Sequence, residues 1–203
     1  MIDSYRTIAV PARAKITRKK SRFIGLLYPV SSIDEINEVL ERIKRQYHDA
    51  THHCYAYRLL GKEGVISRAD DAGEPAGSAG PPILQALEGA ELYDVLAVVV
   101  RYFGGVKLGI GGLIRAYGDA VKEVLAQADI ILRVHEIGLE VNFPPQMSGQ
   151  VMAVLHRCGA KIEKMSYDDL GRVRVRLRSS MVGQFTSQLR DATGARGKIR
   201  EME

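Results

Sequence analysis

The spacing of hydrophobic and polar residues predicts strands and helices that alternate along the first two thirds of the chain. Hydrophobic runs indicate strands at residues 5–12, 22–30, 52–60, 64–68 and 94–102. Ser32 and Glu35 have the spacing of a capping box, and hydrophobic residues at helical intervals follow them. A hairpin turn is expected at Gly61-Lys62-Glu63-Gly64, and a short helix near Pro82. This interleaving predicts an α/β sandwich.

A further helix is predicted over residues 112–128, directly after a glycine-rich segment. Its hydrophobic face is expected to comprise Leu113, Ile114, Tyr117, Val121, Val124 and Leu125.

The last third of the chain has a simpler pattern of its own. Strands are expected at residues 137–143, 160–167, 172–178 and 198–202. One helix precedes Gly159 and another covers residues 181–192. The resulting order is βαββαβ, a ferredoxin-like unit. The fold class is therefore predicted as α+β with two domains, residues 1–134 and residues 135–203.

Composition limits the classes of protein that fit. The 203 residues are 46% hydrophobic and 26% charged, which is ordinary for a globular protein. The hydrophobic runs are too short to span a bilayer, and Met1-Ile2-Asp3-Ser4 does not begin a signal peptide. Cys54 and Cys158 make a disulfide framework improbable. We therefore expect a cytoplasmic protein without a membrane partner.

The net charge of +5 is compatible with nucleic-acid binding but does not identify it. The shorter predicted domain carries the higher density of positive charge.

The glycine-rich segment is the first candidate site. The β-branched strand is followed by Gly104, Gly105, Lys107, Gly109, Gly111 and Gly112, and then by the helix that carries Arg115. A glycine turn before a helix N-terminus presents N–H groups to an anion. The segment does not match the nucleotide-binding G-x-x-x-x-G-K-[ST] motif, because neither Ser nor Thr follows Lys107. The alternative is a tight crossing of two backbones with no ligand.

An acidic loop precedes it in the sequence. Asp70, Asp71 and Glu74 lie before a run of Gly, Pro, Ser and Ala. Such a loop could hold a divalent cation, or its carboxylates could accept backbone N–H groups within a solvated turn. Cys54 lies beside His52 and His53, which suggests a metal ligand or a nucleophile, but its alternating strand pattern favours a core thiol.

An arginine-rich strand is the second candidate site. Arg172, Arg174, Arg176 and Arg178 alternate with hydrophobic residues. Period two places the four arginines on one face, and the third strand of a βαββαβ unit is central. They are predicted to bind RNA or another polyanion. The alternative is an exposed face neutralised by cross-strand acids such as Glu140 and Glu163.

Four segments together resemble the YigZ/IMPACT family: KKSRFI (19–24), THHCYA (51–56), DDAGEPAGSAG (70–80) and VVVRYFGGVKLGIGGLIRAYG (98–118). Ala72 is an extra residue relative to the family's usual Asp-Asp-Gly-Glu-Pro, so either Asp70 or Asp71 takes the usual position. The resemblance implies a first domain like the second domain of a small-subunit ribosomal protein. It implies a second domain like a C-terminal domain of elongation factor G. Eukaryotic relatives look like regulators of a starvation-responsive translation kinase, a mechanism that does not simply carry over to this chain. What the resemblance implies here is an association with nucleic acid or the ribosome and a link to the regulation of translation.

Two functions follow from these features. The first is a binding protein that associates with RNA or the ribosome, or with an acidic protein. The second is an enzyme that acts on a phosphorylated small molecule. In it, the acidic loop would hold Mg²⁺ or act as a general base. The sequence favours binding, because no nucleophile–base pair is evident, and no cofactor or metal is assigned. The predicted ligand-binding residues are Asp70, Asp71, Glu74, Arg101, Tyr102, Gly104, Gly105, Lys107, Gly109, Gly111, Gly112 and Arg115.

Overall fold

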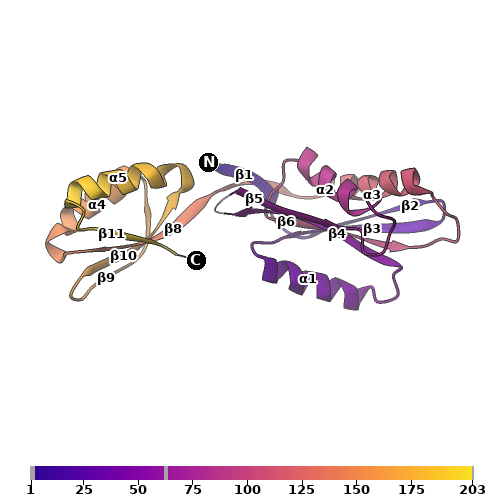
Figure 1. Ribbon diagram of the computed structural model, residues 1–203, viewed down its shortest axis with the longest axis horizontal. Helices are drawn as coiled ribbons and strands as arrows, with labels where there is room; N and C mark the ends of the chain where they lie inside the picture. Colours follow the sequence, from indigo (N-terminus) through magenta and orange to yellow (C-terminus); the bar gives the residue numbers. More distant parts are fainter. Residues whose placement is uncertain (1–2, 62–63, 203) are drawn as a thin grey trace. The chain divides into compact units, whose positions relative to one another are not determined.

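The computed structural model describes residues 3–61 and 64–202, which form a mixed α/β structure (Figure 1). Residues 6–132 form one compact unit, and residues 133–202 together with residues 3–5 form the other. Residues 3–5 thus belong with the second unit, whereas the sequence analysis placed them in the first. Asp3 explains this, because its carboxylate accepts hydrogen bonds from the Ser180 N–H (2.9 Å) and hydroxyl (2.6 Å).

The first unit is built on one antiparallel five-stranded sheet. The strand order is β2 (Ala12–Arg18), β3 (Ser21–Pro29), β6 (Val95–Tyr102), β4 (His52–Gly61) and β5 (Gly64–Asp70). Helix α1 (Ile33–Gln46) packs on one face, and α2 (Gly80–Gly89) and α3 (Ile110–Leu125) cover the other (Figure 1). Strand β6 is central and buried from Val95 to Arg101, which explains its continuous hydrophobic run.

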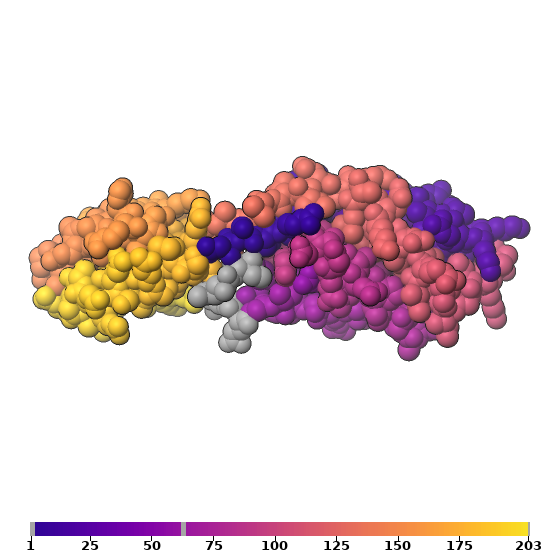
Figure 2. Space-filling model, turned by 90° about the horizontal axis from the view of Figure 1, so that it is seen from above, coloured from indigo at the N-terminus to yellow at the C-terminus, as the bar shows by residue number. Residues whose placement is uncertain are grey.

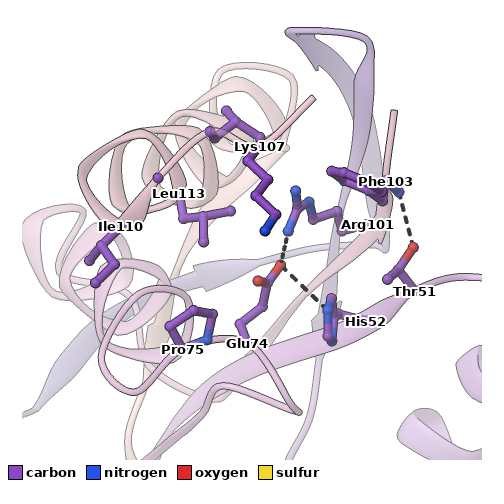
Figure 3. A pocket seen from close by; sticks show the side chains of 11 residues that line it. Thr51, His52, Glu74, Pro75, Arg101, Phe103, Lys107, Ile110 and Leu113 are labelled. Carbon is purple, nitrogen blue, oxygen red and sulfur yellow. Dashed lines mark hydrogen bonds and ion pairs between the residues drawn. The ribbon is translucent and has the colours of Figure 1, made fainter. Parts of the chain in front are cut away.

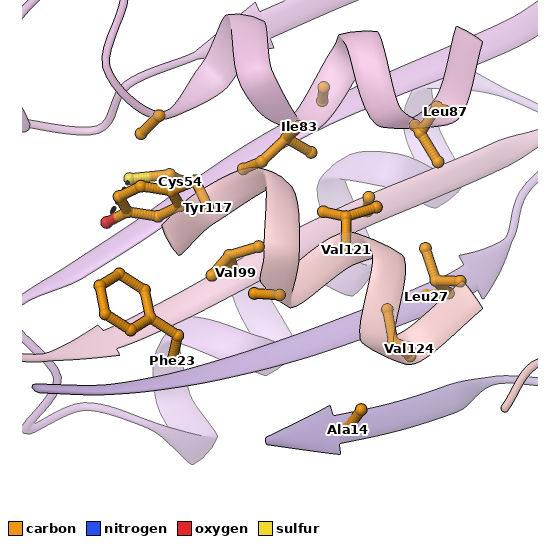
Figure 4. Close-up of a cluster of buried hydrophobic side chains, with 14 of the residues drawn as sticks. Ala14, Phe23, Leu27, Cys54, Ile83, Leu87, Val99, Tyr117, Val121 and Val124 are labelled. Carbon is orange, nitrogen blue, oxygen red and sulfur yellow. Dashed lines mark hydrogen bonds between the residues drawn. The ribbon is translucent and has the colours of Figure 1, made fainter. Parts of the chain in front are cut away.

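The core between the sheet and helices α2 and α3 includes residues that adjoin the candidate site. Phe23 and Tyr117 meet edge to face at 5.2 Å, beside Cys54 and Val99 (Figure 4). Gly25 permits close packing of α3, because a Cβ at this position would lie 2.5 Å from the Ala120 carbonyl oxygen. Tyr117 is therefore held rigidly with its hydroxyl directed toward the site.

Several predicted element limits differ from the structure. The expected strand at 5–12 corresponds to β1 (Ser4–Ile8), which ends earlier than predicted and pairs with the unpredicted β7 (Ile130–Val134). Strand β2 was missed because its charged residues alternate around few hydrophobic positions, as befits an edge strand.

Helix α3 begins two residues earlier and ends three residues earlier than predicted. Ile114, which was expected in the core, is 41% exposed because it lies on the outer side of this helix.

The other predicted elements of this unit are present with similar limits. Ser32 accepts the Glu35 N–H as the capping box requires, but Glu35 accepts the N–H of Ser31 instead of that of Ser32. The predicted turn residues Lys62 and Glu63 lie outside the described residues.

The second unit has the element order βαββαβ. The elements are β8 (Glu136–Phe143), α4 (Ser148–Arg157), β9 (Lys161–Tyr167), β10 (Gly171–Arg178), α5 (Val182–Thr193) and β11 (Lys198–Glu201). Short 3₁₀ turns, Pro145–Met147 and Ser179–Met181, precede the two helices. The strand order is β11-β8-β10-β9, so the arginine-rich β10 is central, as predicted.

Helices α4 and α5 cover one face of this sheet, and Figure 2 looks onto that side. Among residues 3–61 and 64–202, none of the helices has the length and hydrophobicity needed to cross a bilayer.

Candidate functional site

A cavity of about 390 Å³ lies in the first unit where the acidic loop meets the glycine-rich segment (Figure 3). It is lined by Thr51, His52, Glu74, Pro75, Arg101, Phe103, Lys107, Leu108, Gly109, Ile110 and Leu113. These residues come from the start of β4 and the residue before it, the loop after β5, the end of β6, the glycine-rich loop that follows it, and the start of α3. Segments far apart in the sequence therefore build one site.

The polar floor of the cavity is a buried ion pair. Arg101 Nη1 donates to Glu74 Oε1 at 2.5 Å, and the Tyr117 hydroxyl donates to the same oxygen at 2.7 Å. The side chains of Arg101 and Glu74 are only 7% and 3% exposed. Burial, reinforced by Cys54 and Glu74, raises the pKa of Tyr117, so its hydroxyl stays a hydrogen-bond donor.

His52 stands beside this pair. Its Nδ1 lies 2.9 Å from the Ala72 carbonyl oxygen, which only accepts hydrogen bonds, so Nδ1 carries a proton. Its Nε2 lies 3.9 Å from Glu74 Oε1. His53 contacts the Tyr47 carbonyl oxygen instead. The side chains of these two neighbouring histidines thus lie on opposite faces of the sheet, as expected for consecutive residues of a strand.

Asp71 has a structural task in the acidic loop. Its carboxylate accepts the N–H groups of Gly77, Ala79 and Gly80 at 2.7–2.8 Å, which fixes the loop against the start of α2. Burial opposes ionisation, but these three hydrogen bonds lower the pKa of Asp71 overall.

Asp70 also lies outside the cavity lining. It accepts the Ala72 N–H at 2.9 Å and lies 3.5 Å from Arg68. Asp71 and Glu74 have different partners from Asp70 and from each other: backbone N–H groups for Asp71, and Arg101 and Tyr117 for Glu74. Within the described part of the chain, no three His, Cys, Asp or Glu side chains gather as metal ligands would. Of the three carboxylates predicted to bind a ligand, Glu74 lines the cavity, whereas Asp70 and Asp71 do not, and the loop's own backbone N–H groups occupy Asp71.

The glycine-rich segment contains the tight backbone crossing that the sequence analysis gave as its alternative interpretation. Gly104 is a tight crossing, since a Cβ there would lie 2.1 Å from the Lys20 carbonyl carbon. Gly105 and Gly109 have φ values of +83° and +74° with open space around them. Gly109 caps α3 and accepts the Leu113 N–H at 2.9 Å. Gly111 and Gly112 lie in the first turn of the helix, whose N-terminus borders the cavity.

The remaining predicted residues separate into two places. Lys107 lines the cavity, and Figure 3 shows its side chain extending toward the Arg101–Glu74 pair. Arg115 borders a different surface depression with Asp119 and Lys122. Tyr102 donates its hydroxyl to Asp49 at 2.8 Å and packs under Arg22. Tyr102 is the strand neighbour of Arg101 and points to the opposite face of the sheet. Arg115 lies further along α3 than the cavity residues Ile110 and Leu113 and points to another side of the helix. Both are therefore outside the cavity.

Sequence reasoning did not predict the apolar wall of the cavity. It also did not predict that Thr51 and His52 line the cavity, or that Tyr117 donates to Glu74. Phe103 and Ile110 are 47% and 59% exposed beside the glycines. Large hydrophobic residues in a polar, glycine-rich segment were a signal for such a wall. Tyr117 had no signal of its own, because its helical position matched the core.

The second candidate site, a basic face, covers the open side of the sheet in the second unit. Val173, Val175 and Leu177 are buried, whereas the four alternating arginines are exposed. Arg174 pairs with Glu140 at 2.9 Å and Arg176 pairs with Glu163 at 2.5 Å. Cross-strand acids thus pair with Arg174 and Arg176, as the alternative interpretation expected, and the Arg174 hydrogen bond lowers the pKa of Glu140.

Further cations share the basic face. Cross-strand register places Lys164 opposite Arg174, Lys161 opposite Arg176, and Arg200 opposite Glu140. The exposed cations of the basic face are Arg172, Arg174, Arg176, Arg178, Lys161, Lys164, Lys198 and Arg200. Ion pairs join Glu136, Glu140 and Glu163 to cations of this face. Positive charge is in excess.

Cys54 is a core thiol. It is fully buried, and its sulfur lies 3.0 Å from the Asp71 carbonyl oxygen and 3.3 Å from the Tyr117 hydroxyl. Burial raises its pKa from the ordinary 9.0 to about 12, so the nucleophilic thiolate is suppressed near neutral pH.

This shift predicts a pH dependence of folding. The unfolded thiol ionises above pH 9.0 and the folded one only near 12, so stability is unaffected below 9.0 and falls between these values. The slope that Cys54 contributes approaches about 1.4 kcal/mol per pH unit. Urea unfolding at pH 8, 9 and 10 should show a shallower decline for Cys54→Ala than for the natural chain. An identical decline, or fast reaction of Cys54 with Ellman's reagent in Cys158→Ala at pH 8, would contradict the assignment.

Comparisons with known proteins agree with the resemblance read from the motifs. Residues 19–125 match the Impact N-terminal domain. The chain is 34% identical over 203 residues to the IMPACT family member YvyE of Bacillus subtilis, covering 100% of this chain and 93% of that protein. It is also 34% identical over 194 residues to the IMPACT family member YigZ of Escherichia coli, with 94% of each covered.

A solved structure described as a hypothetical protein superposes with a TM-score of 0.72 at 30% identity, over 100% of this chain and 99% of that chain. Both the sequence and the fold are thus shared along the whole length. The chain belongs to the IMPACT family.

Proposed function

We propose that this protein associates with RNA or the ribosome, takes part in the regulation of translation, and makes its contact through the basic face of the second unit. The observation that carries this proposal is the eight exposed cations on one sheet face, opposed by three carboxylates. Such an excess attracts a phosphate backbone. The βαββαβ order and the strand order β11-β8-β10-β9 also support a ferredoxin-like unit, a fold that the family resemblance implies.

The distribution of the charges favours a polyanion over a small ligand. The four arginines of β10 span about 20 Å at ~3.3 Å per residue, which matches several successive phosphates. A hollow of about 60 Å³ lies between Lys164, Ser166, Arg172 and Arg174. Three cations and a hydroxyl around a small hollow can hold one phosphate group. Tyr167, 52% exposed, is the nearby aromatic residue, so base-specific stacking should be weak.

A salt titration tests this proposal. Binding of a single-stranded poly(U) oligonucleotide to the full chain should weaken as salt rises, because bound phosphates release counterions. Changing both Arg174 and Arg176 to Ser should weaken binding and reduce the slope of log K against log salt by about 1.4, or ~0.7 per lost contact. The cost to folding should be small, because both arginine side chains are about half exposed, at 49% and 52%.

The matched control changes Arg157 and Arg190 to Ser, because these exposed arginines lie on α4 and α5. It removes the same charge from the other side of the unit and should leave most of the affinity and slope. Equal effects of the two double variants would indicate only a net-charge effect and refute the basic face. Absence of binding by the natural chain at low salt would refute nucleic-acid binding, and binding to an acidic peptide instead would favour a protein partner.

A further inference from the structure

The cavity of the first unit has unsatisfied polar groups that the proposed polyanion surface does not explain. Glu74 is the only hydrogen-bond partner of the Arg101 guanidinium among the described residues, and the buried Nε has none. On Glu74, Oε1 takes both hydrogen bonds, and no described residue donates to Oε2. Buried polar groups of folded proteins are normally paired. The Arg101 Nε is enclosed by protein atoms, whereas Glu74 lines the cavity and its Oε2 can accept a further hydrogen bond there.

Positive charge at the cavity exceeds negative charge. Glu74 is balanced by Arg101, while Lys107 forms no ion pair within 4 Å among the described residues. The first turn of α3 borders the same space through Gly109, Ile110 and Leu113. Its leading N–H groups precede the first helical hydrogen bond, which Leu113 donates to Gly109. Lys107 and this helix start together favour an anionic group.

The remaining wall is apolar. Phe103, Leu108, Ile110, Leu113 and Pro75 line the rest of the cavity. Figure 3 shows Phe103, Ile110, Leu113 and Pro75 around the ion pair. Phe103 and Ile110 are exposed hydrophobic residues at this rim. A cavity of about 390 Å³ is within the range of small-molecule sites and is larger than a lone phosphate requires. The occupant that fits all three features has an anionic head, an apolar body and a hydrogen-bond donor.

We propose that this cavity binds a small phosphate monoester with a partly apolar or aromatic body. Lys107 and the first turn of α3 hold the phosphate at the rim, Phe103 and Leu113 contact the body, and Glu74 Oε2 accepts a hydroxyl of the ligand. Phosphate suits the rim better than a carboxylate does, because its oxygens accept an ammonium and several N–H groups at once. The site lies in the first unit and goes beyond the proposed polyanion contact.

Calorimetric titration of the full chain with phenyl phosphate tests this site. Phenyl phosphate should bind one to one, about tenfold or more tighter than either inorganic phosphate or benzoate. Of the three, only phenyl phosphate has both a phosphate group and a ring. Lys107→Met should weaken binding about tenfold. Ile110→Glu should abolish it by placing a carboxylate at the phosphate position.

Matched controls lie on the same helix. Lys122→Met and Ile114→Glu alter exposed α3 residues that border the separate depression, and both should bind phenyl phosphate normally. Changing Arg174 and Arg176 to Ser should also leave this binding intact, which separates its outcome from that of the polyanion proposal. The site is refuted by a lack of saturation at about 10 mM phenyl phosphate. Wild-type binding by Lys107→Met and Ile110→Glu, or equal binding of benzoate, also refutes it.

Discussion

Replacing Arg101 with Met should lower the free energy of unfolding by about 3–5 kcal/mol. The variant leaves Glu74 charged and 3% exposed, without the guanidinium that donates to it. The Tyr117 hydroxyl at 2.7 Å remains, but a neutral donor cannot replace an opposite charge in a buried site. Met keeps an aliphatic stem at this position, but the contacts of the guanidinium with the Phe23 and Phe103 rings, each 5.5 Å from Cζ, are lost together with the charge. Urea denaturation monitored by circular dichroism measures the loss.

A second variant isolates the electrostatic cause. Combining Arg101→Met with Glu74→Gln removes the uncompensated charge, and it should recover about half or more of the lost free energy. Glu74→Gln alone should cost less than Arg101→Met, because the amide oxygen still accepts from Tyr117. If the double variant is no more stable than Arg101→Met, the loss arises from packing and the buried pair is not the cause.

Replacing Gly104 with Ala should destabilise the first unit by about 3 kcal/mol and displace the glycine-rich segment. The new Cβ would lie 2.1 Å from the Lys20 carbonyl carbon and 2.4 Å from the Ser21 nitrogen. Both are backbone atoms, so a side-chain rotation cannot relieve the overlap. The Gly104 N–H also donates to the Ser21 hydroxyl at 3.1 Å, and this hydrogen bond would be strained. Thermal and urea unfolding measure the loss.

Gly118→Ala is the matched control for this substitution. Gly118 lies within α3, and a Cβ there would meet nothing within 4 Å. Alanine in a helix interior is favoured over glycine, so this variant should gain about 0.5–1 kcal/mol. Equal stability of the two variants would show that the crossing at Gly104 tolerates a side chain. The tight contact would then not be what positions Phe103 and Lys107.

The acidic loop shows how far sequence reasoning could reach toward the site. Three carboxylates within five residues indicated a specialised loop, and the loop is indeed shaped by them. Their separate roles depend on different partners: Asp71 accepts backbone N–H groups at the start of α2, whereas Glu74 meets Arg101, 27 residues further along. A pattern in one segment cannot specify which carboxylate the neighbouring backbone will take up.

The sequence by itself determined the elements that depend on local periodicity. Hydrophobic spacing predicted α1, the buried β6 and the βαββαβ order, because each reports burial along a single strand or helix. The alternation in β10 likewise determined that its arginines share an exposed face. Only the tertiary structure decided that Glu74, Arg101 and Tyr117 form one buried network and that Arg115 lies outside it. Such choices depend on the packing of α3 against the sheet, where one turn of a helix separates a side chain in the cavity from one outside it.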